Sequence, residues 1–230
     1  MYTQLTADQV KTLQTSFINK VYAWMCLALT LTGFVALRTA SSEAMLSFIF
    51  GSPIVIIGLF LALLGLVFWM SSAINRMSSN MAIGLFMLYS ALNGLILSSI
   101  FLVYTTASIA STFFVTAGTF GAMSAYGYFT KRDLTSWGNL LFMALMGLLI
   151  ALFVSFFWQN TLFDLIISYA GVLIFIGLTA YDTQRIKQMS LEVDAESEEG
   201  RKGAIMGALA LYLDFINLFI FLLRIFGNRR

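Results

Sequence analysis

The sequence predicts an all-α polytopic membrane protein, with seven transmembrane helices in a single domain and the last helix surrounded by the other six. Hydrophobic residues make up 60% of its 230 residues and charged residues only 10%, which is far from the composition of a soluble domain. Residues 77 to 130 and 134 to 163 contain no Asp, Glu, Lys or Arg, so neither stretch could form a soluble surface. A membrane-spanning helix needs about 20 apolar residues, and seven stretches approach that length.

The first half of the chain contains three of these stretches. Residues 1 to 20 are polar, with apolar residues at roughly helical spacing, and we expect either a cytoplasmic tail or a helix lying on the membrane surface. The first span is expected at 21–37 and stops at Arg38. The second, 53–70, opens with Ser52 as N-cap and Pro53 at the first helical position. The third, 81–103, follows a turn that carries Arg76.

The second half contains four further stretches. A span is expected at 108–129, where Ala117, Gly121 and Ala125 recur every four positions, a pattern that allows close approach between helices. Further spans are expected at 137–158 and 165–182. A charged loop then leads to the last span, 203–226. The whole of 21–230 is therefore interpreted as one membrane domain.

The last span carries one ionisable residue near its middle, Asp214. No other charge occurs between Lys202 and Arg224, and Asp214 is separated from Lys202 by ~18 Å of helix, which places it deep in a hydrocarbon core ~30 Å thick. Such a residue is expensive to bury, and a functional role is the default hypothesis. Asn217 shares its helix face and supports a polar interior surface.

Asp182, near the end of the sixth span, has two interpretations. It could be an ordinary helix-end carboxylate paired with Arg185. Alternatively, the sixth and seventh spans are antiparallel neighbours that bring Asp182 and Asp214 together, and two buried carboxyl groups in contact share a proton. Asp182 is only ~8 Å from Lys187, whereas Asp214 is ~18 Å from Lys202, so this contact requires a tilted helix or a loop that dips inward.

Several kinds of chemistry are excluded by composition. The chain has no histidine and one cysteine, Cys26, which excludes Ser-His and Cys-His catalysis, zinc-histidine sites and intrachain disulfides. A net charge of +2 does not suggest nucleic acid. The acidic loop 192–200 fails the EF-hand pattern, because Glu199 stands where the loop needs glycine and Ile205 where it needs glutamate. We therefore expect a solvated loop, no metal site and no cofactor.

Lysine and arginine are distributed unequally between the two sides of a seven-helix arrangement. With a cytoplasmic N-terminus, nine of the 13 basic residues face the cytoplasm and four face the other side, which favours this orientation. Arg224, Arg229 and Arg230 then lie outside if the last span crosses completely. A partly inserted or re-entrant last segment, wrapped in protein, would return them to the cytoplasm.

Three sequence motifs resemble those of the Bax inhibitor family, also called the transmembrane Bax inhibitor motif family. They are AYDTQ at 180–184, LYLDFINLF at 211–219 and LRIFG at 223–227. The short loops are similar to those of bacterial inner-membrane members. The resemblance implies seven helices with the last one central.

The resemblance also implies a function. Members include pH-sensitive calcium leaks in which two aspartates, matching Asp182 and Asp214, form a hydrogen-bonded pair that gates the path. In some bacterial relatives a basic residue after the second helix helps to latch the closed state. This sequence has Ser71 and Ser72 there, and its nearest basic residue is Arg76.

Three functions follow as hypotheses. The first is a proton-regulated leak of calcium or another cation, because a buried carboxylate pair without a cage of oxygen ligands suits passage better than storage. The second is regulatory binding to another membrane protein, such as a quality-control protease. The third is an intramembrane aspartyl protease, which is disfavoured because residues 211–213 lack the glycines expected before the second aspartate and no proline follows Pro53.

Overall fold

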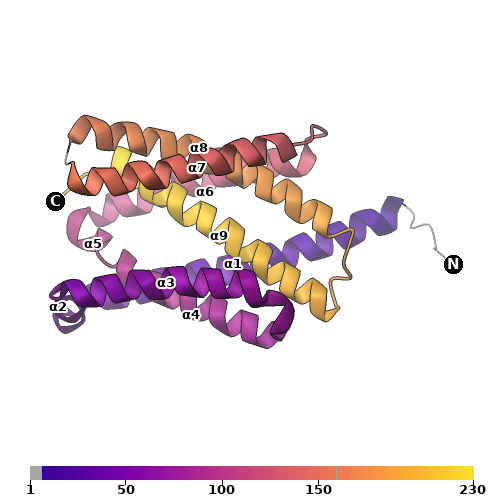
Figure 1. The fold of residues 1–230 in the computed structure, drawn as a ribbon, viewed down its shortest axis with the longest axis horizontal. Helices are drawn as coiled ribbons and strands as arrows, with labels where there is room; N and C mark the ends of the chain where they lie inside the picture. The colour runs from indigo at the N-terminus through magenta and orange to yellow at the C-terminus, as the bar shows by residue number, and fades with distance from the viewer. Residues whose placement is uncertain (1–6, 159) are drawn as a thin grey trace. The chain divides into compact units, whose positions relative to one another are not determined.

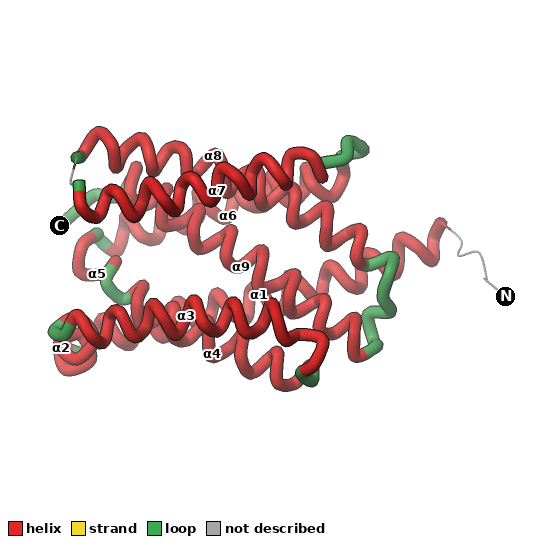
Figure 2. The backbone as a smooth tube through the Cα atoms, viewed as in Figure 1, coloured by secondary structure: helices red, strands yellow, loops and turns green. Residues whose placement is uncertain are grey.

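The computed structural model describes residues 7–158 and 160–230, and side chains from residue 13 onward. Within that part of the chain the regular secondary structure is entirely helical, which confirms the all-α prediction (Figures 1 and 2). The chain divides into two compact units, which are described separately. The first contains the described residues up to Val103 together with Ile186–Leu209, and the second contains Tyr104–Arg185 and Ala210–Arg230. Residues 1 to 6 of the expected tail lie outside the described residues.

The first unit is built on the packing of α1 against α4. Its helices are α1 (Ala7–Ala40), α2 (Glu43–Phe50), α3 (Pro53–Ala73), the short 3-10 helix η1 (Ile74–Arg76), α4 (Ser79–Leu97) and α5 (Ile100–Val103). The hydroxyl of Thr32 on α1 donates to the carbonyl of Ser90 on α4 at 2.9 Å. A Cβ at Gly94 would lie 2.7 Å from the Thr32 carbonyl, so glycine is what allows the two backbones to approach this closely.

Helix starts in the first unit follow the expected chemistry with one difference. Helix α3 begins at Pro53 with Ser52 as its N-cap, as predicted, but the Ser52 side chain makes no capping bond and its backbone carbonyl accepts from Val55 instead. Helix α4 begins after Ser78, whose hydroxyl accepts from the Met81 N–H. Helix α2 was not predicted, because its eight residues are too few to stand out beside the spans.

The second unit contains α6 (Thr106–Phe129), α7 (Thr135–Phe157), most of α8 (Thr161–Met189) and the second half of α9 (Glu198–Phe226). Edge-to-face contacts join Phe113 and Phe120 of α6 to Phe215 of α9. Phe175 of α8 stacks on Phe221 of α9. Phe113 also meets Phe219, further along α9, so α9 runs antiparallel to α6. Asp182 lies later than Phe175 in α8, but its partner Asp214 lies earlier than Phe221 in α9, so α9 is antiparallel to α8 as well.

The segment that follows α9 is attached to the start of α6. Tyr104 and Arg229 form an antiparallel bridge, the Thr105 N–H donates to the Asn228 carbonyl at 3.1 Å, and the Asn228 N–H donates to the Ser108 hydroxyl at 2.9 Å. Arg229 therefore lies at the end of the unit where α6 begins, and the 130–134 turn lies at the other end. Helix α9 is uninterrupted, so the chain does not turn back within it.

Among the described residues, six helical stretches are long and apolar enough to cross a membrane, namely 13–40, 53–76, 79–103, 135–157, 161–189 and 198–226. The expected span at 108–129 is a 24-residue helix, α6, but its many Ser, Thr and Gly residues make it less apolar than the others. The apolar stretch of α9 is 72% buried, against 39% or less in the other five. This burial supports a central last helix, which stays a prediction together with the count of seven.

The small residues of α6 pack differently from the prediction. Ala117, Gly121 and Ala125 are all exposed, and a Cβ added at Gly121 would meet nothing within 4 Å. Gly127 makes the close approach instead, because a Cβ there would lie 3.0 Å from the backbone Cα of Ala180 on α8. The prediction was wrong because spacing of four identifies a face of a helix without showing which face meets a neighbour.

Candidate functional site

The candidate site is the contact between Asp182 of α8 and Asp214 of α9, both in the second unit. Their side chains are joined by a hydrogen bond. An ionised carboxylate has acceptors only, so this bond requires a proton on one of the two groups. The structure thus brings the two predicted aspartates together, and a functional role for the pair stays a prediction.

Helix lengths explain how the two aspartates reach one level. Helix α8 continues ~10 Å beyond Asp182 to Met189, whereas α9 begins ~24 Å before Asp214, at Glu198. Residues 190 to 197 connect the two helices, and eight residues can span ~26 Å when extended. The connection can therefore absorb the offset of ~14 Å between these two helix lengths.

The two carboxyl groups lie in different surroundings. Asp214 is 4% exposed and its Oδ2 atom is buried without a hydrogen-bond partner in the protein. Asp182 is half-buried, and the charge of Arg185 acts on it, although the two side chains do not form a direct ion pair. The interpretation of Asp182 as an ordinary helix-end partner of Arg185 therefore loses its main support.

A hydroxyl of α6 belongs to the same polar interior. Ser124 is 7% exposed and its Oγ atom has no partner. It lies between Phe120, which contacts Phe215 of α9, and Gly127, which approaches Ala180 of α8. Residues at these spacings share one face of a helix, so Ser124 faces the two helices that carry the aspartates. The sequence signal for Ser124 is weak, because α6 contains many Ser and Thr residues.

The supporting residues named from the sequence have separate positions. The Asn217 amide donates to the Leu213 carbonyl of its own helix at 2.8 Å, so this hydrogen bond is made within α9 and not to the aspartate pair. Arg76 lies exposed in η1 of the first unit. Arg185 lies three residues after Asp182 in α8, close enough for its charge to act on that carboxyl group, and a functional role for each of the three stays a prediction.

Gln184 is a structural residue that sequence reasoning did not single out. Its side chain is 8% exposed, accepts from the Leu134 N–H at 2.8 Å and donates to the Arg132 carbonyl at 2.8 Å. These two bonds attach the turn between α6 and α7 to α8, two residues from Asp182. A polar side chain next to a predicted buried aspartate was the available signal.

Similarity to known proteins agrees with the motifs around the two aspartates. Residues 14–230 match the family described as "Inhibitor of apoptosis-promoting Bax1". Inner membrane protein YbhL of Escherichia coli (strain K12) is 54% identical over 216 residues, which cover 94% of this chain and 92% of that protein. The chain belongs to the Bax inhibitor family. An uncharacterized protein of Deinococcus radiodurans is 42% identical over 230 residues, covering 100% of this chain and 96% of its own length.

Part of the acidic loop of this Bax inhibitor family protein holds neighbouring helices in place. Glu196 forms an ion pair with Lys20 of α1. The Glu198 carboxylate accepts from the Ser79 N–H at 2.6 Å and from the Ser79 hydroxyl at 2.9 Å, which caps the start of α4. The expectation of a merely solvated loop was therefore incomplete. Among the described residues, no group of three or more Asp, Glu, His or Cys side chains is placed to hold a metal ion.

Proposed function

We propose that this protein is a pH-sensitive leak channel or transporter for calcium or another cation, gated by the Asp182 and Asp214 pair. The observation that carries the proposal is the hydrogen bond between these two carboxyl groups. Asp214 is the one ionisable residue of the last helix between Lys202 and Arg224. Its partner in the pair, Asp182, comes from α8. A carboxyl pair at such a depth is costly to keep unless it has a role.

The pair supplies both a switch and an ion-attracting group. While one proton is shared, the two carboxyl groups attract each other and hold α8 against α9. Loss of that proton leaves two negative charges that repel each other, which favours separation of the helices and offers oxygen ligands to a cation. The pair has too few oxygen ligands to retain calcium tightly, and this favours passage over storage. We therefore expect flux to increase as pH rises.

The proposal includes a membrane and an orientation. The printed name of the Escherichia coli relative places that protein in the inner membrane. For this chain we propose the same membrane with a cytoplasmic N-terminus. This orientation puts nine basic residues on the cytoplasmic side and four on the other side. The bridge between Tyr104 and Arg229 supports a last helix that crosses fully, because it brings the end of α9 to the start of α6.

The test is calcium flux from liposomes that contain the purified protein, measured between about pH 6 and 8. Asp214→Asn and Asp182→Asn each keep a donor that can bond to the remaining carboxylate at any pH, so we expect low flux without a pH step. Asp164→Asn is the matched control, because Asp164 is also an aspartate of α8 but accepts from Ser155 and lies outside the pair. Its flux should follow the wild type.

Two outcomes decide the proposal. A pH-dependent flux that Asp164→Asn retains and either pair variant loses or shifts would support the aspartate gate. Equal flux from empty liposomes, wild type and all three variants at every pH would exclude calcium conduction. Regulatory binding to another membrane protein would then become the leading hypothesis, and it would be examined by copurification with the wild type and with both pair variants.

A further inference from the structure

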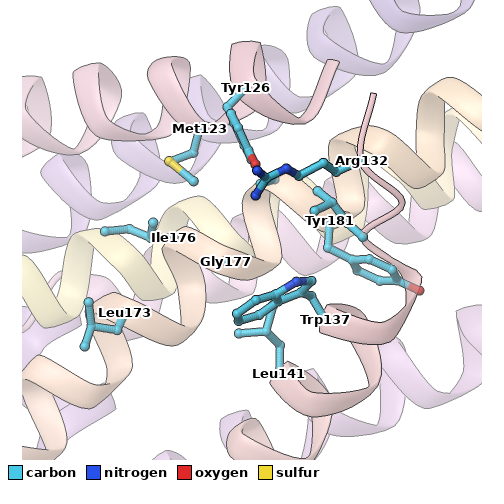
Figure 3. Close-up of a pocket in the computed structure, with 11 residues that line it drawn as sticks. Met123, Tyr126, Arg132, Trp137, Leu141, Leu173, Ile176, Gly177 and Tyr181 are labelled. Carbon is cyan, nitrogen blue, oxygen red and sulfur yellow. The ribbon is translucent and has the colours of Figure 1, made fainter. Parts of the chain in front are cut away.

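A second candidate site is a cavity of about 270 Å³ in the second unit, lined by α6, α7, α8 and the turn between α6 and α7. Figure 3 shows its lining residues. The Arg132 guanidinium and the Tyr126 hydroxyl lie toward each other at one end, and Trp137 lies next to Leu141 on the other side of the α8 ribbon in this view. Leu173 and Ile176 lie at the other end. The cavity is thus polar at one end and apolar along the rest.

The polar end has a cation that no protein carboxylate pairs with among the described residues. The Arg132 backbone is fixed, because its carbonyl accepts from Gln184 and its N–H donates to the Thr130 hydroxyl at 3.3 Å. The Oδ1 atom of the neighbouring Asp133 accepts from the N–H and hydroxyl of Thr135, which hold the pKa of Asp133 below its ordinary value, and Asp133 forms no ion pair with Arg132. The Arg132 guanidinium is therefore available to an anion from outside the protein.

The direction of the cavity matches a membrane amphiphile. Arg132 lies in a turn between two apolar helices, where Trp and Tyr side chains gather at a membrane interface. From Tyr181 to Leu173 the cavity follows α8 for ~12 Å toward its apolar end. Arginine binds phosphate with a fork of two hydrogen bonds, and basic pockets between transmembrane helices bind anionic lipid headgroups.

We propose that this cavity binds an anionic phospholipid, with its phosphate on Arg132 and one acyl chain along Leu173 and Ile176. The volume of about 270 Å³ lies just below the range of pockets for drug-sized ligands. The cavity opens beside Ala180 and Tyr181, the two residues before Asp182. This assignment depends on the geometry of the cavity alone and does not rest on the proposed calcium leak.

The experiment measures the thermal stability of the detergent-solubilised protein during titration with phosphatidylglycerol, and native mass spectrometry counts the lipids retained. Phosphatidylcholine with the same chains tests the headgroup, and glycerol 3-phosphate tests the headgroup without chains. We expect phosphatidylglycerol to stabilise the wild type at lower concentrations than phosphatidylcholine, and glycerol 3-phosphate to have no effect.

Two pairs of variants locate the effect. Arg132→Gln should weaken the apparent affinity for phosphatidylglycerol about tenfold, the effect of losing a charge-assisted hydrogen bond. Lys131→Gln removes the adjacent cation, which does not line the cavity, and should leave the affinity unchanged. Leu173→Trp fills the apolar end and should also weaken binding, whereas Ile166→Trp, on an exposed part of the same helix, should not.

Three results would overturn the assignment. The first is equal stabilisation by phosphatidylcholine and phosphatidylglycerol, which would mean that any lipid chain fills the groove. The second is an equal loss in Lys131→Gln and Arg132→Gln, which would mean diffuse attraction to the basic turn. The third is stabilisation by glycerol 3-phosphate as strong as by the lipid, which would identify a small-anion site.

Discussion

Replacement of Gly127 by alanine should destabilise the second unit, although alanine is the better helix former. The added Cβ would lie 3.0 Å from the backbone Cα of Ala180 and closer still to its carbonyl oxygen. Those are backbone atoms that cannot rotate away, so α6 and α8 must move apart. Overpacking of this kind costs about 1–3 kcal/mol.

The matched control is Gly118→Ala on the same helix, where a Cβ would meet nothing within 4 Å. Both variants gain the same helix propensity, about 1 kcal/mol, because glycine loses more backbone freedom on folding. The difference between them therefore isolates the steric clash. A difference of about 2 kcal/mol would change the unfolding equilibrium constant roughly 30-fold.

The assay is unfolding of the purified protein in bicelles, followed by tryptophan fluorescence, for wild type and both variants. We expect Gly118→Ala to equal or exceed the wild type and Gly127→Ala to fall below it. If the two variants unfold at the same denaturant concentration, the contact between α6 and α8 at Ala180 is wrong, and with it the packing on which Ser124 was placed near the aspartates.

Two further predictions concern the turns and the loop. Gln184→Met should destabilise the protein by about 1–3 kcal/mol in the same unfolding assay, because the Leu134 N–H and the Arg132 carbonyl lose their partner, whereas Gln188→Met, at an exposed position, should have little effect. The pKa of Glu196 is held below its ordinary value by the hydrogen bond and charge of Lys20, with Arg201 assisting and Asp194 opposing. A lowered folded-state pKa stabilises the fold above the unfolded-state pKa, and this contribution is lost as pH falls through the folded-state pKa. The difference in melting temperature between wild type and Glu196→Gln should therefore shrink between about pH 6 and pH 3, and a difference that stays constant or grows would contradict the ion pair.

The sequence predicted the all-α class and the presence of several membrane-spanning helices, because long apolar stretches and isolated charges carry strong signals. The start of α3 at Pro53 and the aspartates in α8 and α9 are examples. The predicted first span began at residue 21, whereas helix α1 begins at Ala7. The first turns of α1 are polar. Apolar content identifies the part of a helix that can lie in the membrane, and it does not show where the helix itself begins.

Which faces meet could not be predicted so well. Gly121 and Gly127 look alike in the sequence, yet only Gly127 lies against a neighbouring backbone. Asn217 shares a face with Asp214 but bonds to its own helix. Side-chain partners depend on the rotation of each helix about its axis and on the depth of its neighbours. A single sequence carries little information on either, and the cavity beside Arg132 depends on both.

The attachment of residues 227–230 to the start of α6 has a consequence for synthesis. The Ser108 hydroxyl and the Thr105 N–H emerge from the ribosome about 120 residues before Asn228, their partner. During that interval the start of α6 holds polar groups that only water or a chaperone can satisfy. These bonds can therefore form only after the end of α9 has been made, so the start of α6 is the last part of the second unit to gain its partners.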